Sequence, residues 1–127
     1  MSAGGPTIRV EEPGDEAGLG LVRQLFRAYA VEYGPPFAAI FDVQGFDAEV
    51  AGLPGRYAPP SGCLLLAMEE DVPAGCVALR ELGDGTCEMK RLYVAPESRG
   101  RGVGRWLVEE VVRRAERSEE RRVGKEC

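Results

Sequence analysis

Histidine is absent from this sequence of 127 residues, so any proton transfer has to use carboxylates, tyrosine, cysteine, lysine, the chain termini or water. The four cysteines include no C-x-x-C pair, which argues against a zinc site and a disulfide framework and suits a reducing cytoplasm. No apolar run approaches the ~20 residues that a membrane span needs, and no secretory signal is evident at the start. We therefore expect one small cytoplasmic domain without a metal or a membrane partner.

Positive charge is scarce overall but unevenly distributed. The net charge is −5, which makes nucleic acid an unfavourable partner. Residues 1–85 contain 5 basic and 13 acidic side chains, whereas residues 86–116 contain 7 basic and 5 acidic ones. This distribution favours a local anion site in an acidic protein over a broad surface for polyanions.

The N-terminal half predicts one strand and one long helix. Residues 7–12 are typical of a short strand. Asp15 is placed to cap a helix whose apolar residues recur at steps of three and four, and the run Gly34-Pro35-Pro36 ends that helix. The apolar face consists of Leu19, Val22, Phe26, Tyr29 and Tyr33. Residues 34–61 are rich in turn-forming residues, with room for one short helix at 46–53.

The C-terminal half predicts a meander of three strands followed by a helix. The strands are expected at 63–68, 74–82 and 86–94, and their short connections favour antiparallel pairing. The helix begins near residue 103, with a stripe of apolar residues for burial. The order β-α-α-β-β-β-α predicts an α/β (α+β) sandwich, in which helices flank a mixed, mainly antiparallel sheet.

The segment 99–105 joins the last expected strand to the last helix and contains three glycines and three arginines. Backbone N–H groups at a helix N-terminus lack intrahelical partners and bind anions, glycine permits close approach, and arginine suits phosphate. The sequence therefore predicts a phosphate-binding loop, the alternative being a glycine-rich turn with solvated arginines. A Walker loop is excluded because no G-K-S/T follows, and the spacing G-x-G-x-G differs from the dinucleotide pattern G-x-G-x-x-G.

The string "LYVAPESRGRGVGRWLVEEV" resembles the fourth strand, pyrophosphate loop and third helix of the GNAT family of N-acetyltransferases. It matches their motif Q/R-x-x-G-x-G/A from Arg99 to Gly104, and the order of elements extends the resemblance over residues 7–116. The resemblance implies a GNAT-like fold, acetyl-CoA as co-substrate, no metal, and direct transfer without a covalent enzyme intermediate. The residues that would hold acetyl-CoA are Leu92, Tyr93 and Val94 of the strand and Arg99, Gly100, Arg101, Gly102, Val103, Gly104 and Arg105 of the loop.

The resemblance also implies catalytic roles. The N–H of Val94 would stabilise the oxyanion, and Glu88 would act as the general base, directly or through a water. Period-2 alternation places Glu88, Lys90, Leu92 and Val94 on one face of the strand. The alternative for Glu88 is a solvated or salt-bridged side chain. The candidate residues for the acceptor pocket, each with packing as its alternative, are Tyr33, Phe37 and Tyr57.

The tail "RSEERRVGKEC", residues 117–127, breaks the apolar stripe of the preceding helix. It resembles the translation of a common DNA-library adapter, with a solvated helix extension as the alternative. We therefore expect residues 1–116 to be an N-acetyltransferase domain that is incomplete at its C-terminus, and 117–127 to be non-native. On this basis the tail would supply no strand, the fourth strand would keep an exposed edge, and the chain would be poorly stable and weakly active or inactive. The family's usual general acid cannot be assigned.

Taken together, the sequence predicts an enzyme that moves an acetyl group from acetyl-CoA to the amine of a small molecule, with a peptide or protein amine as a weaker option. The alternative from another class is a non-catalytic module that binds or senses CoA or a phosphate ligand. Both functions use the loop at 99–105, so the loop does not separate them. A homodimer is a further expectation for the intact protein.

Overall fold

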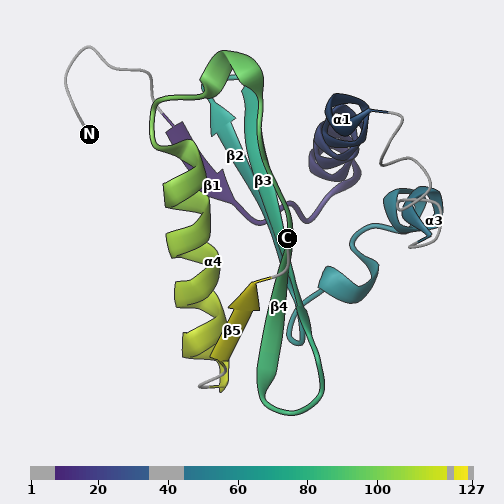
Figure 1. Ribbon diagram of the computed structural model, residues 1–127, viewed down its shortest axis with the longest axis vertical. Coiled ribbons are helices and arrows are strands. Elements are labelled where there is room, and N and C mark those ends of the chain that lie inside the picture. Colours follow the sequence, from purple (N-terminus) through teal and green to yellow (C-terminus); the bar gives the residue numbers. More distant parts are fainter. Residues whose placement is uncertain (1–7, 35–44, 120–121, 126–127) are drawn as a thin grey trace.

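The centre of the protein is a five-stranded sheet, shown in Figure 1 in a computed structural model that describes residues 8–34, 45–119 and 122–125. The strands lie in the order β1-β2-β3-β4-β5. Neighbours from β1 to β4 pair antiparallel, and β5 pairs parallel to β4. The strand bounds are β1 Ile8–Glu11, β2 Cys63–Glu69, β3 Val72–Glu81, β4 Thr86–Val94 and β5 Arg122–Lys125. The predicted antiparallel meander is confirmed for β2 to β4.

Helices cover both faces of this sheet. Helix α1 (Glu16–Tyr33) and the short α3 (Phe46–Ala51) lie on one side, and α4 (Val103–Glu119) lies on the other (Figure 1). As predicted, Asp15 caps α1 by accepting a hydrogen bond from a first-turn N–H at 2.9 Å, and Gly34 ends it at φ 76°. No helix in the described part of the chain has the length and apolar character to cross a membrane.

Two apolar cores form, one on each face of the sheet, because alternate residues of a strand point to opposite sides. The first lies under α1 and α3 and the second under α4. The residues of β2 are divided between them: the α1 core receives Leu64, Leu66 and Met68, and the α4 core receives Cys63, Leu65 and Ala67. Both faces of β2 are thus buried, which explains why its sequence is a continuous apolar run.

Strand β4 contains a bulge at Arg91, whose φ is 60°. Its register with β3 changes from Ala78 opposite Lys90 to Cys76 opposite Tyr93, so the single residue between these pairs in β3 lies opposite two residues of β4, 91 and 92. An extra residue of this kind shifts the alternation of side chains beyond it to the other face.

The prediction that Glu88, Lys90, Leu92 and Val94 share one face is therefore wrong. Both neighbours of Glu88 in β4 belong to the α4 core, so Glu88 itself faces the α1 side, and Lys90 lines a cavity with residues of α3. Leu92 and Val94, beyond the bulge, pack against the α4 core. The left-handed conformation of Arg91 thus decides which side chains of β4 face α1 and which face α4.

A fifth strand is formed by tail residues 122–125, which pair in parallel with residues 86–89 of β4 (Figure 1). The prediction that the tail supplies no strand is wrong, and the edge of β4 is not exposed along its whole length. The pairing stops at Met89, so β5 leaves the edge of residues 90–94 uncovered. The non-native origin of residues 117–127 stays a prediction.

Candidate functional site

The loop between β4 and α4 presents a row of backbone N–H groups. Gly100 and Gly102 have φ of 83° and 82°, a left-handed conformation that costs a residue with a Cβ roughly 1–2 kcal/mol. Within the described part of the chain, no carbonyl or side chain accepts a hydrogen bond from the N–H groups of residues 100–105. These donors lie at the N-terminus of α4 and are available to an anion.

Two of the three loop arginines are already paired with carboxylates. Arg99 donates from Nη2 to both carboxylate oxygens of Glu32 at 2.8 Å, and Arg101 forms an ion pair with Glu69. Hydrogen bonds from Arg99, and then from Tyr93, lower the pKa of the Glu32 carboxyl. Arg105 makes no ion pair or hydrogen bond to any described residue. An anion at this loop would therefore meet the backbone N–H groups and one unpaired guanidinium, that of Arg105. The other two guanidiniums already have carboxylate partners.

Near Val94, no described strand pairs with the edge of β4 that faces away from β3. The N–H of Ala95 donates to the Ala74 carbonyl of β3 at 2.8 Å, so the N–H and carbonyl of Val94 point the other way. The Val94 carbonyl accepts a hydrogen bond from Arg99 Nε at 2.9 Å. The N–H of Val94 is thus directed toward the uncovered edge, as an oxyanion donor requires, while its carbonyl is occupied by the loop.

Glu88 lies on the α1 side of β4 and is held by Arg80 of β3, whose Nε donates to Glu88 Oε1 at 2.5 Å. The carboxylate side chain is 14% exposed. Six residues of strand separate Glu88 from Val94, which corresponds to about 20 Å at ~3.3 Å per residue. One amine cannot touch both groups, and a single bridging water spans only about 5–6 Å, so a base at Glu88 needs a chain of several waters to reach an amine that attacks beside Val94.

Beside Glu88, the bulge carries a buried ion pair. Arg91 donates from Nε and Nη2 to the two oxygens of Glu49 in α3, both at 3.0 Å, and its guanidinium lies 5.3 Å from the Phe46 ring centre. Tyr57 donates its hydroxyl to Glu49 Oε2 at 2.9 Å. Burial, followed by the charge of Glu49, raises the pKa of Tyr57. This network ties α3 to β4 on the face where Glu88 lies.

Tyr33 and Tyr57, two of the three residues predicted for the acceptor pocket, lie in different surroundings. Tyr33 is 46% exposed near the end of α1, with its ring 4.9 Å from that of Tyr29. Tyr57 is 3% exposed and is a core residue of the network just described, although it also lines a cavity. Phe37 lies outside the described residues. In the part of the chain that the structure describes, no group of three carboxylates and thiols is placed to hold a metal ion.

The model of the acetyltransferase (GNAT) family matches residues 20–126. The chain belongs to this family. An "Uncharacterized N-acetyltransferase" of Schizosaccharomyces pombe is 43% identical over 94 residues, which cover 72% of this chain. The chain spans 58% of the length of that relative.

Solved structures agree with the GNAT fold. An acetyltransferase from Streptococcus agalactiae superposes with a TM-score of 0.72 at 21% identity, covering 93% of this chain and 71% of the other. The PaiA N-acetyltransferase from Thermoplasma acidophilum, in complex with coenzyme A, superposes with a TM-score of 0.67 at 17% identity, covering 87% of this chain and 73% of the other. At these identities the likeness concerns the fold.

Sequence reasoning located the glycine loop of this GNAT chain but missed the residues that hold it. Glu32 and Glu69, which pair with the loop arginines, are 67 and 32 residues away from them in the sequence. The Arg91–Glu49 pair is separated by 42 residues. No local pattern marks such pairs, whereas the glycines with positive φ follow from a turn that only glycine tolerates.

Proposed function

We propose that this GNAT chain carries the acetyl-CoA site of an N-acetyltransferase that acts on small-molecule amines. The observation that carries the proposal is the row of unpaired N–H groups at residues 100–105, with glycines at the two left-handed positions. The family match and the name of the Schizosaccharomyces relative support acetyl transfer. The coenzyme A complex of the Thermoplasma neighbour supports the cofactor class.

Acetyl-CoA supplies a thioester whose acyl carbon an amine attacks, so that a C–N bond forms and the C–S bond breaks. The amides of residues 100–105 would hold the pyrophosphate, with Arg105 as the nearby unpaired cation. The N–H of Val94 would stabilise the negative charge that develops on the acyl oxygen. Glu88 would accept the proton of the amine through a chain of several waters. The proton on the leaving sulfur comes from a group that we do not assign.

Glu88→Gln tests the enzymatic part of the proposal. We expect kcat to fall at least about 100-fold, because general-base catalysis contributes that much or more, while the affinity for CoA is unchanged. Thiol release from acetyl-CoA in the presence of an amine panel measures turnover, and calorimetric titration with CoA measures binding. Glu109→Gln is the matched control, since Glu109 is exposed on α4 and no interaction of its side chain occurs among the described residues.

The possible results separate the two function classes. Retained CoA binding without turnover of any amine, in the wild type, favours the non-catalytic binding or sensing module. Unchanged CoA binding and unchanged turnover in Gly102→Ala would contradict the role of the loop in holding CoA. Unchanged kcat in Glu88→Gln would remove Glu88 as the base and leave the CoA site standing.

Three further expectations stay proposals. We propose a cytoplasmic location, because Cys63 and Cys76 are buried and form no disulfide with any described residue. We propose that the chain ending in residues 117–127 is less active than the natural gene product, and that the latter is a homodimer. Recovering the gene beyond residue 116, and comparing turnover and mass in solution of the two products, tests the last two.

A further inference from the structure

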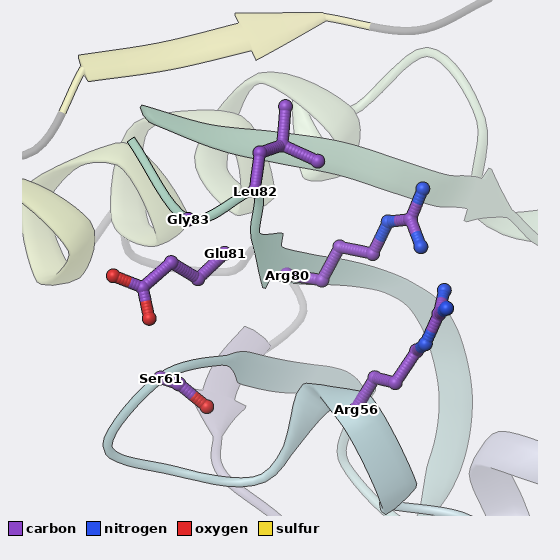
Figure 2. Close-up of a pocket in the computed structure, with 6 residues that line it drawn as sticks. All are labelled: Arg56, Ser61, Arg80, Glu81, Leu82 and Gly83. Carbon is purple, nitrogen blue, oxygen red and sulfur yellow. The ribbon is translucent and has the colours of Figure 1, made fainter. Parts of the chain in front are cut away.

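A cavity of about 490 Å³ opens beside the β3–β4 hairpin, on the face of the sheet where Glu88 lies (Figure 2). It is bounded by the end of β3, the hairpin turn and the segment that contains the 3-10 turn η1 (Gly55–Tyr57). Its lining residues are Arg56, Ser61, Arg80, Glu81, Leu82 and Gly83. Nothing in the mechanism above uses this cavity.

Two guanidinium groups face this cavity with unused hydrogen-bond donors. Figure 2 shows Arg56 and Arg80 extending toward the same side, and Glu81 pointing the opposite way. Arg80 uses only Nε, toward Glu88, and neither of its Nη groups has an acceptor in the described part of the chain. Arg56 forms no hydrogen bond or ion pair with any described residue. Arginine in this arrangement presents planar donors that match a carboxylate or a phosphate.

The positive charge extends toward the proposed reaction centre. A second cavity, of about 460 Å³, shares Arg56 with the first and is also lined by Lys90. Its one carboxylate, Glu49, is already neutralised by Arg91. The carboxylate Glu88 is likewise paired with Arg80. These residues form a local cationic surface in a chain of net charge −5. Such a surface favours an anionic acceptor, whereas the acidic N-terminal half taken as a whole would favour a cationic one.

We propose that Arg56 and Arg80 form a subsite for an anionic group of the amine acceptor. The inference rests on the proposed acetyl transfer and narrows its acceptor to an elongated amine whose carboxylate or phosphate lies on the order of 15–20 Å from the amino group, as the length of β4 between Glu88 and Val94 requires. Arg80 would hold Glu88 through Nε and the acceptor's anion through its Nη groups, so the anion lies one side chain away from the proposed base. Arg56 would supply the second cation. The anion would then accept hydrogen bonds from the Nη groups of Arg80 and from the guanidinium of Arg56, which have no other acceptor among the described residues.

The test compares wild type with Arg56→Gln on two matched pairs of acceptors. The first pair is 11-aminoundecyl phosphate and 11-aminoundecanol, and the second is 11-aminoundecanoate and its amide, because their extended chains are long enough to reach from the cavity toward Val94. We expect Arg56→Gln to raise KM about tenfold for the anionic member that the wild type prefers, since a charge-assisted hydrogen bond of about 1.4 kcal/mol is lost. Its kcat, the KM of the neutral acceptors and the KM of acetyl-CoA should not change. The preferred pair shows whether the anion is a phosphate or a carboxylate.

Arg27→Gln is the matched control, because Arg27 is an exposed residue of α1 with no interaction among the described residues. It removes the same charge and should leave every KM unchanged. An equal rise of KM for charged and neutral acceptors in Arg56→Gln, or a wild-type preference for the neutral member of both pairs, would overturn the proposal.

A binding experiment without turnover distinguishes failure of the subsite from failure of the proposed function. The Nε–Hε signal of Arg56, assigned in nitrogen-15 spectra by its loss in Arg56→Gln, is followed while 11-aminoundecyl phosphate and then 11-aminoundecanoate are added. A saturable shift with either compound, without acetylation of any amine, would support the subsite and reject acetyl transfer. Acetylation of these amines without any shift of that signal would reject the subsite and support acetyl transfer.

Discussion

Replacing Glu49 by Gln removes one charge from the buried pair that ties α3 to the bulge of β4. In the native protein both Glu49 oxygens accept from Arg91 at 3.0 Å, and the Arg91 side chain is 4% exposed. Glutamine keeps the shape but has one acceptor oxygen, so the guanidinium loses a hydrogen bond and its countercharge. Tyr57 has to share the remaining oxygen.

The expected loss is about 3 kcal/mol of unfolding free energy. Breaking a buried pair by removing one partner costs ~3–5 kcal/mol, and the lower end applies because the Glu49 side chain keeps 19% exposure. With a urea m-value of roughly 2 kcal/mol/M for a small domain, the midpoint should fall by about 1.5 M. A loss of this size is a large fraction of the ~5–15 kcal/mol that small proteins have.

The assay is urea denaturation at pH 7, followed by far-ultraviolet circular dichroism. Glu32→Gln is an informative comparison, because Glu32 makes an equally short bidentate pair with Arg99 on the surface, where solvent screens it. We expect Glu32→Gln to lose much less unfolding free energy than Glu49→Gln. The double variant Glu49→Leu with Arg91→Met should recover much of the stability, since no unpaired charge remains. A loss below about 1 kcal/mol in Glu49→Gln, or equal losses at Glu49 and Glu32, would refute this reasoning.

Two other predictions follow from the loop and from the buried thiols. Gly102 has a φ of 82°, so Gly102→Ala should weaken CoA binding about tenfold, because the ~1–2 kcal/mol of strain displaces the amides. Gly20→Ala is the control: a Cβ there meets nothing within 4 Å, and CoA titrations should be unchanged. Burial, and then the charge of Glu12, raises the pKa of the Cys63 thiol from 9.0 to about 11. Because the folded state binds that proton more tightly, its contribution to stability is complete below pH 9 and is lost as the pH rises toward 11. Denaturation midpoints measured from pH 8 to 11 should therefore fall, and less steeply in Cys63→Ala; an identical slope would contradict the assignment.

Most of the elements could be predicted because their determinants are local. Asp15 and Gly34 bound α1 through hydrogen bonds and dihedral angles within one turn of the chain. The hairpin between β3 and β4 contains Gly83 and Gly85, both with positive φ, which the turn requires. The bulge at Arg91 was not predictable, because arginine has no intrinsic preference for φ 60°, and the ion pair that it makes there with Glu49 joins residues 42 positions apart.

In the candidate site, too, the features with local determinants could be predicted and those that depend on tertiary contacts could not. The sequence correctly marked the positions of the glycines in the loop, since only glycine takes the left-handed conformation without strain. It predicted that the three loop arginines add charge suited to a phosphate, but two of them are paired with carboxylates from other elements. It also placed Glu88 and Val94 on one face, which the bulge prevents. Pairing of charges across the fold depends on distances in space that periodicity does not contain.

The sequence by itself determined the succession of strands and helices, the family, and the stretch of bare backbone before α4, because caps, turns and alternation act over a few residues. Only the tertiary structure decided that the tail pairs with residues 86–89 and that the rest of the β4 edge stays uncovered. It also brought Arg56 and Arg80 to one cavity from segments 24 positions apart. The physical reason is that such contacts depend on how the sheet packs against α1, α3 and α4, and packing joins residues that no local pattern relates.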